Sequence, residues 1–388
     1  MTRSISILGA TGSVGSSTLD LIDRNRGDWE VIALTARTSA RELAALARKF
    51  DAQVAVVADE ASLSVLREEL SGTEIEAAAG ASALIEAAAR PADITVAAIV
   101  GCAGLAPTMT AIEQGQTVAL ANKEALVSAG DVMMTSVERY GTTLLPVDSE
   151  HNAIFQCLAG NDLRTVRSIT LTASGGPLRE WPLERLERAT PAEAVAHPNW
   201  DMGAKISVDS ATMFNKGLEL IEAHHLFPVG LDALRIVVHP QSVIHSMVEY
   251  RDGSTLAQLG PPDMRVPIAS CLGWPGRIET PCEPLDLARL GSLTFEEPDE
   301  QRFPATRLAR QAAEAGGGAP AVLNAANEIA VEAFLEGRIA FTNIAVMVDK
   351  TMNRFDIPSA LGSLDQVFHT DRAAREAARA VAQDYAIA

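Results

Sequence analysis

The sequence has few aromatic residues, few cysteines and no long apolar run. Aromatic residues make up 4% of the 388 positions whereas apolar residues make up 47%, so Ala, Val, Leu and Ile must form most of the core. Such a core is typical of α/β and helical proteins. No stretch reaches the roughly 20 apolar residues that a membrane-spanning helix needs, and a chain of this length predicts about two or three domains.

Basic residues are scarce relative to acidic ones. There are 32 Lys and Arg against 50 Asp and Glu, which gives a formal net charge of −18. This balance disfavours binding to nucleic acid or to an anionic membrane surface. We therefore expect a small-molecule substrate and no nucleic-acid or membrane partner, and local groups must hold any anionic substrate against the overall charge.

The cysteines give no sign of disulfides or of a zinc site. Cys102, Cys157, Cys271 and Cys282 lie far apart, with no C-x-x-C pair and no His/Cys cluster at ligand spacing. A strand-like run follows Met1-Thr2-Arg3 directly and leaves no room for a secretory signal. We therefore expect reduced thiols and a cytoplasmic protein.

The hydrophobic pattern changes along the chain. Residues 1–147 alternate short β-branched runs with Ala/Leu-rich helical segments, which predicts a Rossmann-like, doubly wound parallel sheet in an α/β domain. Residues 148–280 contain further strand-like runs and a long aperiodic segment between Trp181 and Met202, so we expect a second α/β domain with a lid loop. Residues 281–303 have the composition of a linker, and 304–388 show the apolar spacing of a helical bundle.

Three glycines separate the first strand-like run from the first helix. Gly9, Gly12 and Gly15 are spaced G-x-x-G-x-x-G, which lets backbone approach a pyrophosphate at the N-terminus of a helix. A tight turn without a ligand is the alternative, and the position at the start of a βαβ pattern favours dinucleotide binding. The second strand ends in Arg37-Thr38-Ser39 instead of an acidic residue, which favours NADP over NAD unless Arg37 is an ordinary solvated side chain.

Three carboxylates form a candidate metal site. Asp148 and Glu150 lie two positions apart at the end of a strand-like run, so we expect them to point the same way. Glu219 lies in a helical NKGLE segment on one face with Asn215 and Lys216. Oxygen ligands suit Mg²⁺ or Mn²⁺ better than Zn²⁺, but a solvated turn and a surface Lys216–Glu219 ion pair explain these patterns equally well.

A candidate phosphate site lies nearby in the sequence. Ser174 precedes a Gly-Gly turn, and Ser210, Asn215 and Lys216 offer a hydroxyl, an amide and an ammonium group. The pattern therefore predicts a divalent metal and a phosphate ester beside NADPH, but it does not name the substrate.

Several long motifs resemble one enzyme family. GATGSVGSSTLDLI, ALANKEALVSAG, PVDSEHNAIFQCL, LTASGGPLRE, HPNWDMGAKISVDSATMFNKGLELIEAHHLF, QLGPPDMRVPIA and VLNAANEIAVEAFL are similar, in order, to the 1-deoxy-D-xylulose 5-phosphate reductoisomerases of the non-mevalonate isoprenoid pathway. The resemblance implies a homodimer that rearranges and reduces 1-deoxy-D-xylulose 5-phosphate to 2-C-methyl-D-erythritol 4-phosphate with NADPH and a divalent cation. A retro-aldol route and an alkyl shift use the same residues, so the sequence leaves both open.

The resemblance also implies roles for individual residues. The metal ligands for Mg²⁺, Mn²⁺ or Co²⁺ are Asp148, Glu150 and Glu219. The substrate contacts are Ser174, Ser210, Asn215 and Lys216 at the phosphate, Lys123 and Ser149 at the hydroxyl end, and His197, Trp200 and Met202 in a lid backed by Pro262. The cofactor contacts are Gly9, Thr11, Gly12, Ser13, Val14, Gly15, Asn122, Glu124 and Gly203, with Arg37, Thr38 and Ser39 at the 2′-phosphate. The catalytic candidates are Lys123, Asp148, Glu150, His197 and Glu219.

Two positions depart from the family pattern, and two other functions stay open. Arg37-Thr38-Ser39 replaces a Gly followed by Lys and Asn, and Ala173 replaces a Gly. An NADP-dependent aldehyde dehydrogenase of the aspartate-semialdehyde type would need a reactive thiolate, for which Cys102 is the best candidate. A catalytically inactive NADP-binding sensor would bind the cofactor without depending on a metal.

Overall fold

The computed structural model describes residues 2–200, 202–227 and 229–386. They fall into two compact units. The first unit consists of Met1–Ala125, Met133–Asn152 and Met264–Cys282, and the second of Leu126–Val132, Ala153–Asp263 and Glu283–Ala388. The division expected from the sequence, at residues 147, 280 and 303, stays a prediction.

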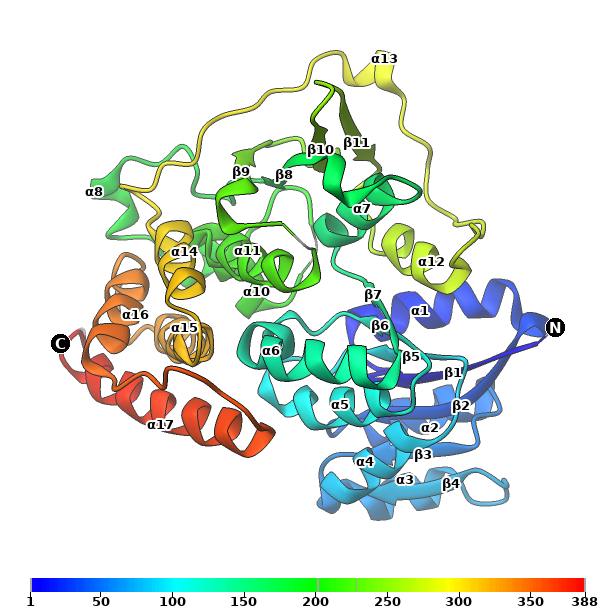
Figure 1. Cartoon of the computed structure of the whole chain (residues 1–388). Helices are drawn as coiled ribbons and strands as arrows, with labels where there is room; N and C mark the ends of the chain where they lie inside the picture. The colour runs from blue at the N-terminus through cyan, green and yellow to red at the C-terminus, as the bar shows by residue number, and fades with distance from the viewer. Residues whose placement is uncertain (1, 201, 228, 387–388) are drawn as a thin grey trace. The chain divides into compact units, whose positions relative to one another are not determined.

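The first unit is built on a seven-stranded parallel sheet (Figure 1). Its strands are β1 (Arg3–Leu8), β2 (Trp29–Ala36), β3 (Val54–Val57), β4 (Glu76–Ala79), β5 (Ile94–Ala97), β6 (Thr117–Leu120) and β7 (Thr143–Pro146). They pair in the order β4-β3-β2-β1-β5-β6-β7, so the winding direction reverses between β1 and β5. Ligands of such sheets bind at this reversal, beyond the carboxyl ends of the strands. The expected Rossmann-like sheet is confirmed.

Helices cover both faces of this sheet. They are α1 (Ser13–Arg24), α2 (Ala40–Lys49), α3 (Leu63–Glu69), α4 (Ala81–Ala89), α5 (Leu105–Glu113) and α12 (Arg265–Gly273), with single turns η1 (Arg26–Asp28), η2 (Glu60–Ser62) and η3 (Cys102–Gly104). In Figure 1, α1 and α12 lie on one side of the strands and α4 and α5 on the other. Two further helices, α6 (Lys123–Tyr140) and α7 (Ser149–Leu158), contribute residues to both units.

The second unit contains a four-stranded mixed sheet. Its strands are β8 (Val166–Ala173), β9 (Leu234–Val238), β10 (Ile244–Tyr250) and β11 (Thr255–Leu259), in the order β11-β10-β8-β9. Only β8 and β9 run parallel to each other. Ile169 and Leu171 of β8 pack against Leu220 and Ala223 of α11 (Phe214–Leu226), so α11 is held directly against the sheet.

The second unit contains further helices, several of which pack around one buried helix. They are α8 (Leu183–Leu186), α9 (Pro191–Val195), α10 (Ala204–Thr212), α13 (Leu287–Leu290), α14 (Ala305–Ala315), α15 (Ala319–Leu335), α16 (Asn343–Arg354) and α17 (Leu364–Gln383), with turns η4 (Leu163–Thr165) and η5 (Leu231–Ala233). Helix α15 is buried over most of its length, and α10, α14, α16 and α17 pack around it. The expected helical C-terminal region is confirmed.

Two segments that look irregular in the sequence contain short regular elements. The segment between Trp181 and Met202 contains α8 and α9, and α9 begins with a capping box in which Thr190 and Glu193 bond to each other's backbone. The expected linker contains α13 and a β-bridge between Val238 and Glu296. These elements are too short to show a period in the sequence. None of the helices in the described ranges has the length and apolar character to cross a membrane.

Candidate active site

The glycine loop joins β1 to α1, and two of its glycines are required by the loop itself. Gly9 has a φ of +97°, and a Cβ there would lie 2.7 Å from the carbonyl oxygen of Ala98. A Cβ on Gly15 would lie 2.3 Å from the carbonyl oxygen of Gly9. Gly12 is different, because it is exposed and its Cβ would meet only Gly9 O at 3.4 Å. Nothing in the first unit itself therefore demands glycine at position 12.

The same loop leaves the N-terminus of α1 available to an anion. Gly12 is the N-cap residue, so no side chain caps the helix, and its first turn carries no acidic residue. Unsatisfied N–H groups and the helix dipole make such an end a binding site for phosphate groups. Thr11 precedes Gly12 in the loop, and Ser13 and Val14 are the first residues of the helix. The loop therefore fits a dinucleotide pyrophosphate.

Arg37, Thr38 and Ser39 follow β2 directly, and all three are exposed. The backbone is fixed on both sides, since Arg37 O accepts from Asp59 N at 3.0 Å and Thr38 O accepts from Ala40 N at 2.8 Å. An exposed guanidinium group beside two hydroxyls suits a phosphate. Their role at a 2′-phosphate stays a prediction.

Asn122 fixes the start of α6. Its Oδ1 accepts the backbone N–H of Ala125 at 3.0 Å, and its Nδ2 donates to Gly101 O at 2.9 Å. The side chain therefore caps α6 and ties it to the segment that follows β5. Lys123 and Glu124 occupy the first turn of the helix.

Lys123 forms a buried ion pair with Asp148. Burial opposes ionisation of Asp148, but the charges of Lys123 and His151, together with hydrogen bonds from Glu150 and Lys123, hold its pKa well below the usual range. Asp148 is therefore an anion at neutral pH, as a metal ligand must be.

Asp148 and Glu150 do not lie on a strand, so the expected alternation was wrong. Strand β7 ends at Pro146, and Glu150 lies in the first turn of α7. The two residues come together by a helix start instead, because Glu150 N donates to Asp148 Oδ1 at 3.4 Å. Ser149 Oγ donates to Glu150 Oε2 at 2.5 Å. Two carboxylates and a hydroxyl thus occupy one short segment.

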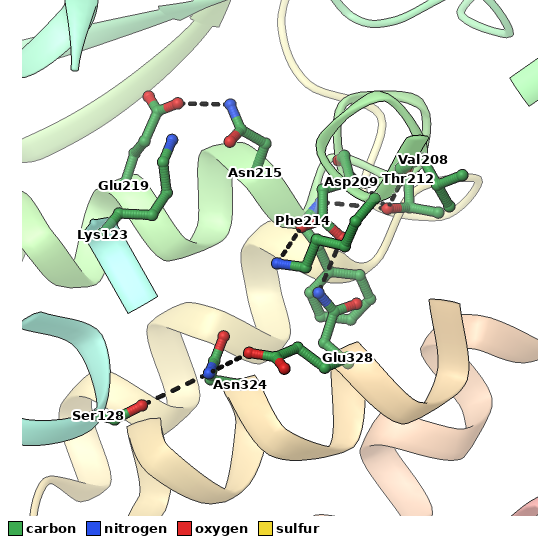
Figure 2. Close-up of polar contacts among 12 residues, drawn as sticks. Lys123, Ser128, Val208, Asp209, Thr212, Phe214, Asn215, Glu219, Asn324 and Glu328 are labelled. Carbon is green, nitrogen blue, oxygen red and sulfur yellow. Dashed lines mark hydrogen bonds and ion pairs between the residues drawn. The ribbon is translucent and has the colours of Figure 1, made fainter. Parts of the chain in front are cut away.

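The second unit places Asn215, Lys216 and Glu219 together at the start of α11. Asn215 Nδ2 donates to Glu219 Oε1 at 2.5 Å (Figure 2), and the Lys216 ammonium pairs with Glu219 Oε2. The side chains of Lys216 and Glu219 are 3% and 1% exposed. The alternative of a surface ion pair was therefore wrong. Burying an ion pair of this kind costs free energy unless further polar partners offset it, so its presence suggests a functional role.

Ser174 lies in a second polar cluster of the same unit. It follows β8 and opens a turn in which Gly175 and Gly176 both have positive φ angles, +79° and +71°. Its Oγ lies 2.8 Å from His197 Nε2 and 3.4 Å from Ser210 Oγ, and it accepts Gly176 N–H at 3.1 Å. The turn therefore gathers two hydroxyls and an imidazole.

His197 is held as a neutral ring. Its Nδ1 accepts the backbone N–H groups of Asn199 and Trp200 at 3.2 and 3.0 Å, so the proton lies on Nε2 and is donated to Ser174. Burial lowers the pKa of His197, which also favours the neutral form.

The segment after His197 is tied to the loop between β9 and β10. Asn199 Nδ2 donates to Pro240 O at 2.7 Å, and the Trp200 ring lies 6.1 Å from that of His245. Met202 is half-buried, Gly203 is the N-cap of α10, and Pro262 is exposed after β11. No local pattern points to Asn199 or His245, because their partners Pro240 and Trp200 lie 41 and 45 residues away.

The two buried thiols do not suit the aldehyde dehydrogenase alternative. Burial raises the pKa of Cys157 to about 11 and that of Cys271 to about 12, so neither is a thiolate at neutral pH.

Comparison with known proteins decides the family. Models of 1-deoxy-D-xylulose 5-phosphate reductoisomerase match residues 5–130, and models of its C-terminal domains match residues 144–227 and 259–377. A reductoisomerase of this name from Zymomonas mobilis is 57% identical over 379 residues, covering 98% of this chain and 97% of the relative. The chain belongs to the 1-deoxy-D-xylulose 5-phosphate reductoisomerase family. A member from Rhodospirillum centenum is 57% identical over 96% of this chain and 92% of its own.

Solved structures of the family confirm the expected fold. The Zymomonas mobilis reductoisomerase in complex with NADPH has a TM-score of 0.94 at 55% identity, covering 99% of this chain and 100% of that chain. A reductoisomerase in complex with NADPH, fosmidomycin and magnesium has a TM-score of 0.93 at 44% identity, covering 98% of both chains. Both of those structures hold NADPH, the cofactor that the sequence predicts here, and the second also holds magnesium. Neither alternative function is favoured.

Proposed function

We propose that this chain converts 1-deoxy-D-xylulose 5-phosphate into 2-C-methyl-D-erythritol 4-phosphate, with NADPH and one divalent cation, as a step of isoprenoid precursor synthesis. The observation that carries the proposal is the cluster in which Ser174 contacts both His197 and Ser210. Hydroxyls, a neutral imidazole and a glycine turn are donors suited to a phosphate monoester, the end of the substrate that takes no part in the chemistry.

At the phosphate end, Ser174, Ser210, Asn215 and Lys216 bind the substrate. Ser174 Oγ accepts from both His197 and Gly176, so its own hydrogen can turn toward a phosphate oxygen. Lys216 supplies a buried positive charge. Such a charge is needed because the net charge of −18 repels an anionic substrate. Binding energy from this end stabilises the closed complex in which the reaction proceeds.

At the reacting end, Asp148, Glu150 and Glu219 hold the cation. All three are carboxylates, which suit Mg²⁺, Mn²⁺ or Co²⁺, and Lys123 keeps Asp148 ionised. When bound, the cation supplies Lewis acidity toward the ketone and neighbouring hydroxyl of the substrate. Lys123 and Ser149 orient the substrate hydroxyls, and Glu150 positions Ser149 through the bond between their side chains.

For the cofactor, the Gly9–Gly15 loop binds the pyrophosphate through the open N-terminus of α1. Arg37, Thr38 and Ser39 contact the 2′-phosphate, and Asn122, Glu124 and Gly203 complete the cofactor contacts. When bound, NADPH supplies the hydride that reduces the rearranged aldehyde.

The lid residues His197, Trp200 and Met202, backed by Pro262, close over the substrate and exclude water. The bond from Asn199 to Pro240 O gives this lid a fixed anchor. Closure stabilises the productive arrangement because His197 links the lid to Ser174.

We further propose a cytoplasmic homodimer, whose mass in light scattering would be twice that of the chain. No disulfide joins the cysteines that the structure describes, which is consistent with a reducing compartment.

The test is to incubate the chain with 1-deoxy-D-xylulose 5-phosphate, NADPH and Mg²⁺ and to identify the product by NMR. The proposal expects 2-C-methyl-D-erythritol 4-phosphate with one NADP⁺ formed per molecule. Tight binding of NADPH without any product would instead support an inactive sensor.

A further inference from the structure

A buried hydrogen bond joins α10 to the C-terminal helix α15. Asn327 Nδ2 donates to Asp209 Oδ1 at 2.8 Å. The other carboxylate oxygen of Asp209 pairs with Lys205 at 2.7 Å. Asp209 is 1% exposed and Asn327 is 0% exposed. Neither residue belongs to the sets that bind substrate, metal or cofactor.

The Asp209–Asn327 pair would stabilise α10 less than an apolar pair at the same positions. Neighbouring positions of both helices, such as Val208, Ala211, Leu323 and Ala330, are apolar and fully buried in one cluster. Burying a carboxylate costs free energy that an apolar pair would not, and such pairs are instead suited to fixing one arrangement of two elements. The bond therefore defines where α10 lies against α15.

The residues of α10 that follow Asp209 contact the phosphate-binding turn. Ser210 follows Asp209 in the chain, and Gly176 lies against the same stretch of backbone, where a Cβ on it would be 2.7 Å from Ala211 Cα and from Ser210 O. Helix α10 thus contacts both the turn at Ser174 and α15. A shift of α10 must change the 3.4 Å separation of Ser174 Oγ and Ser210 Oγ.

The same stretch also sets the start of α11. Thr212 Oγ1 donates to Val208 O at 2.9 Å, with Asp209 O at 3.2 Å, and accepts Phe214 N–H at 3.4 Å. Met213, with a φ of +69°, makes the turn between the helices. Figure 2 shows Asp209, Thr212 and Phe214 gathered at this junction, with Asn215 on the helix that follows.

We propose that Asn327 is a positioning residue for the phosphate end of the substrate. Its bond to Asp209 holds Ser210, and through the α10–α11 junction Asn215 and Lys216, at the separation from Ser174 that a phosphate monoester needs. The inference rests on the proposed role of these four residues as phosphate ligands. A helix that touches no substrate atom thereby sets substrate affinity.

The decisive test is an exchange of the two partners. Asn327→Asp places two carboxylates together, and its KM for 1-deoxy-D-xylulose 5-phosphate should rise at least about ten-fold while its KM for NADPH changes less than about two-fold. The double variant Asp209→Asn/Asn327→Asp restores an amide–carboxylate pair in reverse. Its KM should return to within about three-fold of the wild-type value.

A second variant guards against misfolding of Asn327→Asp. Asn327→Leu has the same number of side-chain heavy atoms, suits the apolar surroundings and leaves Asp209 paired with Lys205. It should fold and show a raised substrate KM of similar size. A wild-type KM in a folded Asn327→Leu protein would overturn the inference.

Glu328→Gln is the matched control on the same helix. Glu328 pairs with Arg375 at 2.7 Å and accepts from Asn324, which also lies beside Ser128 (Figure 2). This variant should lower the melting temperature without changing the substrate KM. If it raises KM as much as Asn327→Asp does, or if the folded double variant keeps the KM of the single one, Asn327 has only a structural role.

Failure of the proposed function can be distinguished from failure of this inference alone. A wild-type protein that does not turn over the substrate, or a Lys216→Ala variant with an unchanged KM, would overturn the phosphate site and the inference with it. Normal results from both, with no recovery in the double variant, would overturn the inference alone.

Discussion

His197 Nε2 lies 2.8 Å from Ser174 Oγ, and the opposite ring nitrogen accepts two backbone N–H groups of the segment that follows. One ring therefore joins the expected lid to the phosphate-binding turn. It can do so only while Nδ1 carries no proton, because a protonated Nδ1 cannot accept.

The pH dependence of kcat/KM should report this ring. Burial lowers the pKa of His197 below its ordinary value of 6.5. The unfolded chain therefore binds the proton more readily than the folded chain does. The stabilisation from this contact is present above about pH 6.5 and is lost as the pH falls through the lower pKa of the folded state. The plot of kcat/KM against pH should therefore fall on its acid side, below about pH 6.5. His197→Asn should lose this acid limb and keep the one from the substrate phosphate, whose second pKa is about 6. Identical acid limbs in both proteins would contradict the assignment.

Glu219→Gln tests the metal ligand. The amide keeps the size of the side chain but removes the charge that binds the cation, so kcat should fall by roughly 10²–10³-fold. NADPH affinity, measured by fluorescence titration, should stay nearly unchanged. Retained activity in excess Mg²⁺ would remove Glu219 from the metal site.

Lys216→Ala tests whether Lys216 binds the substrate phosphate. Loss of a buried charged donor should raise KM for 1-deoxy-D-xylulose 5-phosphate by about 10- to 100-fold. The KM for NADPH serves as the internal control and should not move. A large loss of kcat at an unchanged KM would point instead to a role in the chemical step.

Gly12→Ala tests the cofactor loop. Because its Cβ would meet only Gly9 O at 3.4 Å, the protein should fold with a melting temperature within about 2 °C of wild type. The added methyl group would project toward a bound pyrophosphate, so KM for NADPH should rise by about ten-fold or more. Gly27→Ala is the matched control, since its Cβ would have no neighbour within 4 Å. Equal KM values for NADPH in the two variants would exclude the loop as the pyrophosphate site.

Local patterns were enough to predict much of the fold. The β-branched runs around the Gly9–Gly15 loop and the apolar spacing beyond residue 304 correspond to the parallel sheet and to α14–α17, because both elements have a period that the sequence shows directly. The pair Asp148 and Glu150 was a harder case. A three-residue segment fits a strand end or a helix start equally well, and the structure has the helix start.

Long-range pairs left no signal in the sequence. Asn327 and Asp209 are 118 residues apart, and each looks like an ordinary polar residue in a helical segment. Asn199 and Pro240 are 41 residues apart, and the bond between them depends on how the loop after β9 folds back. These contacts can be identified only when the positions of α10 and of the loop after β9 are known.

NADPH oxidation with 1-deoxy-D-xylulose 5-phosphate, followed with and without EDTA, tests the proposed reaction itself. Oxidation should be steady with Mg²⁺ or Mn²⁺, stop on chelation and recover when the cation is restored. Absence of oxidation with the metal supplied, or oxidation that EDTA does not affect, would contradict the proposed reaction.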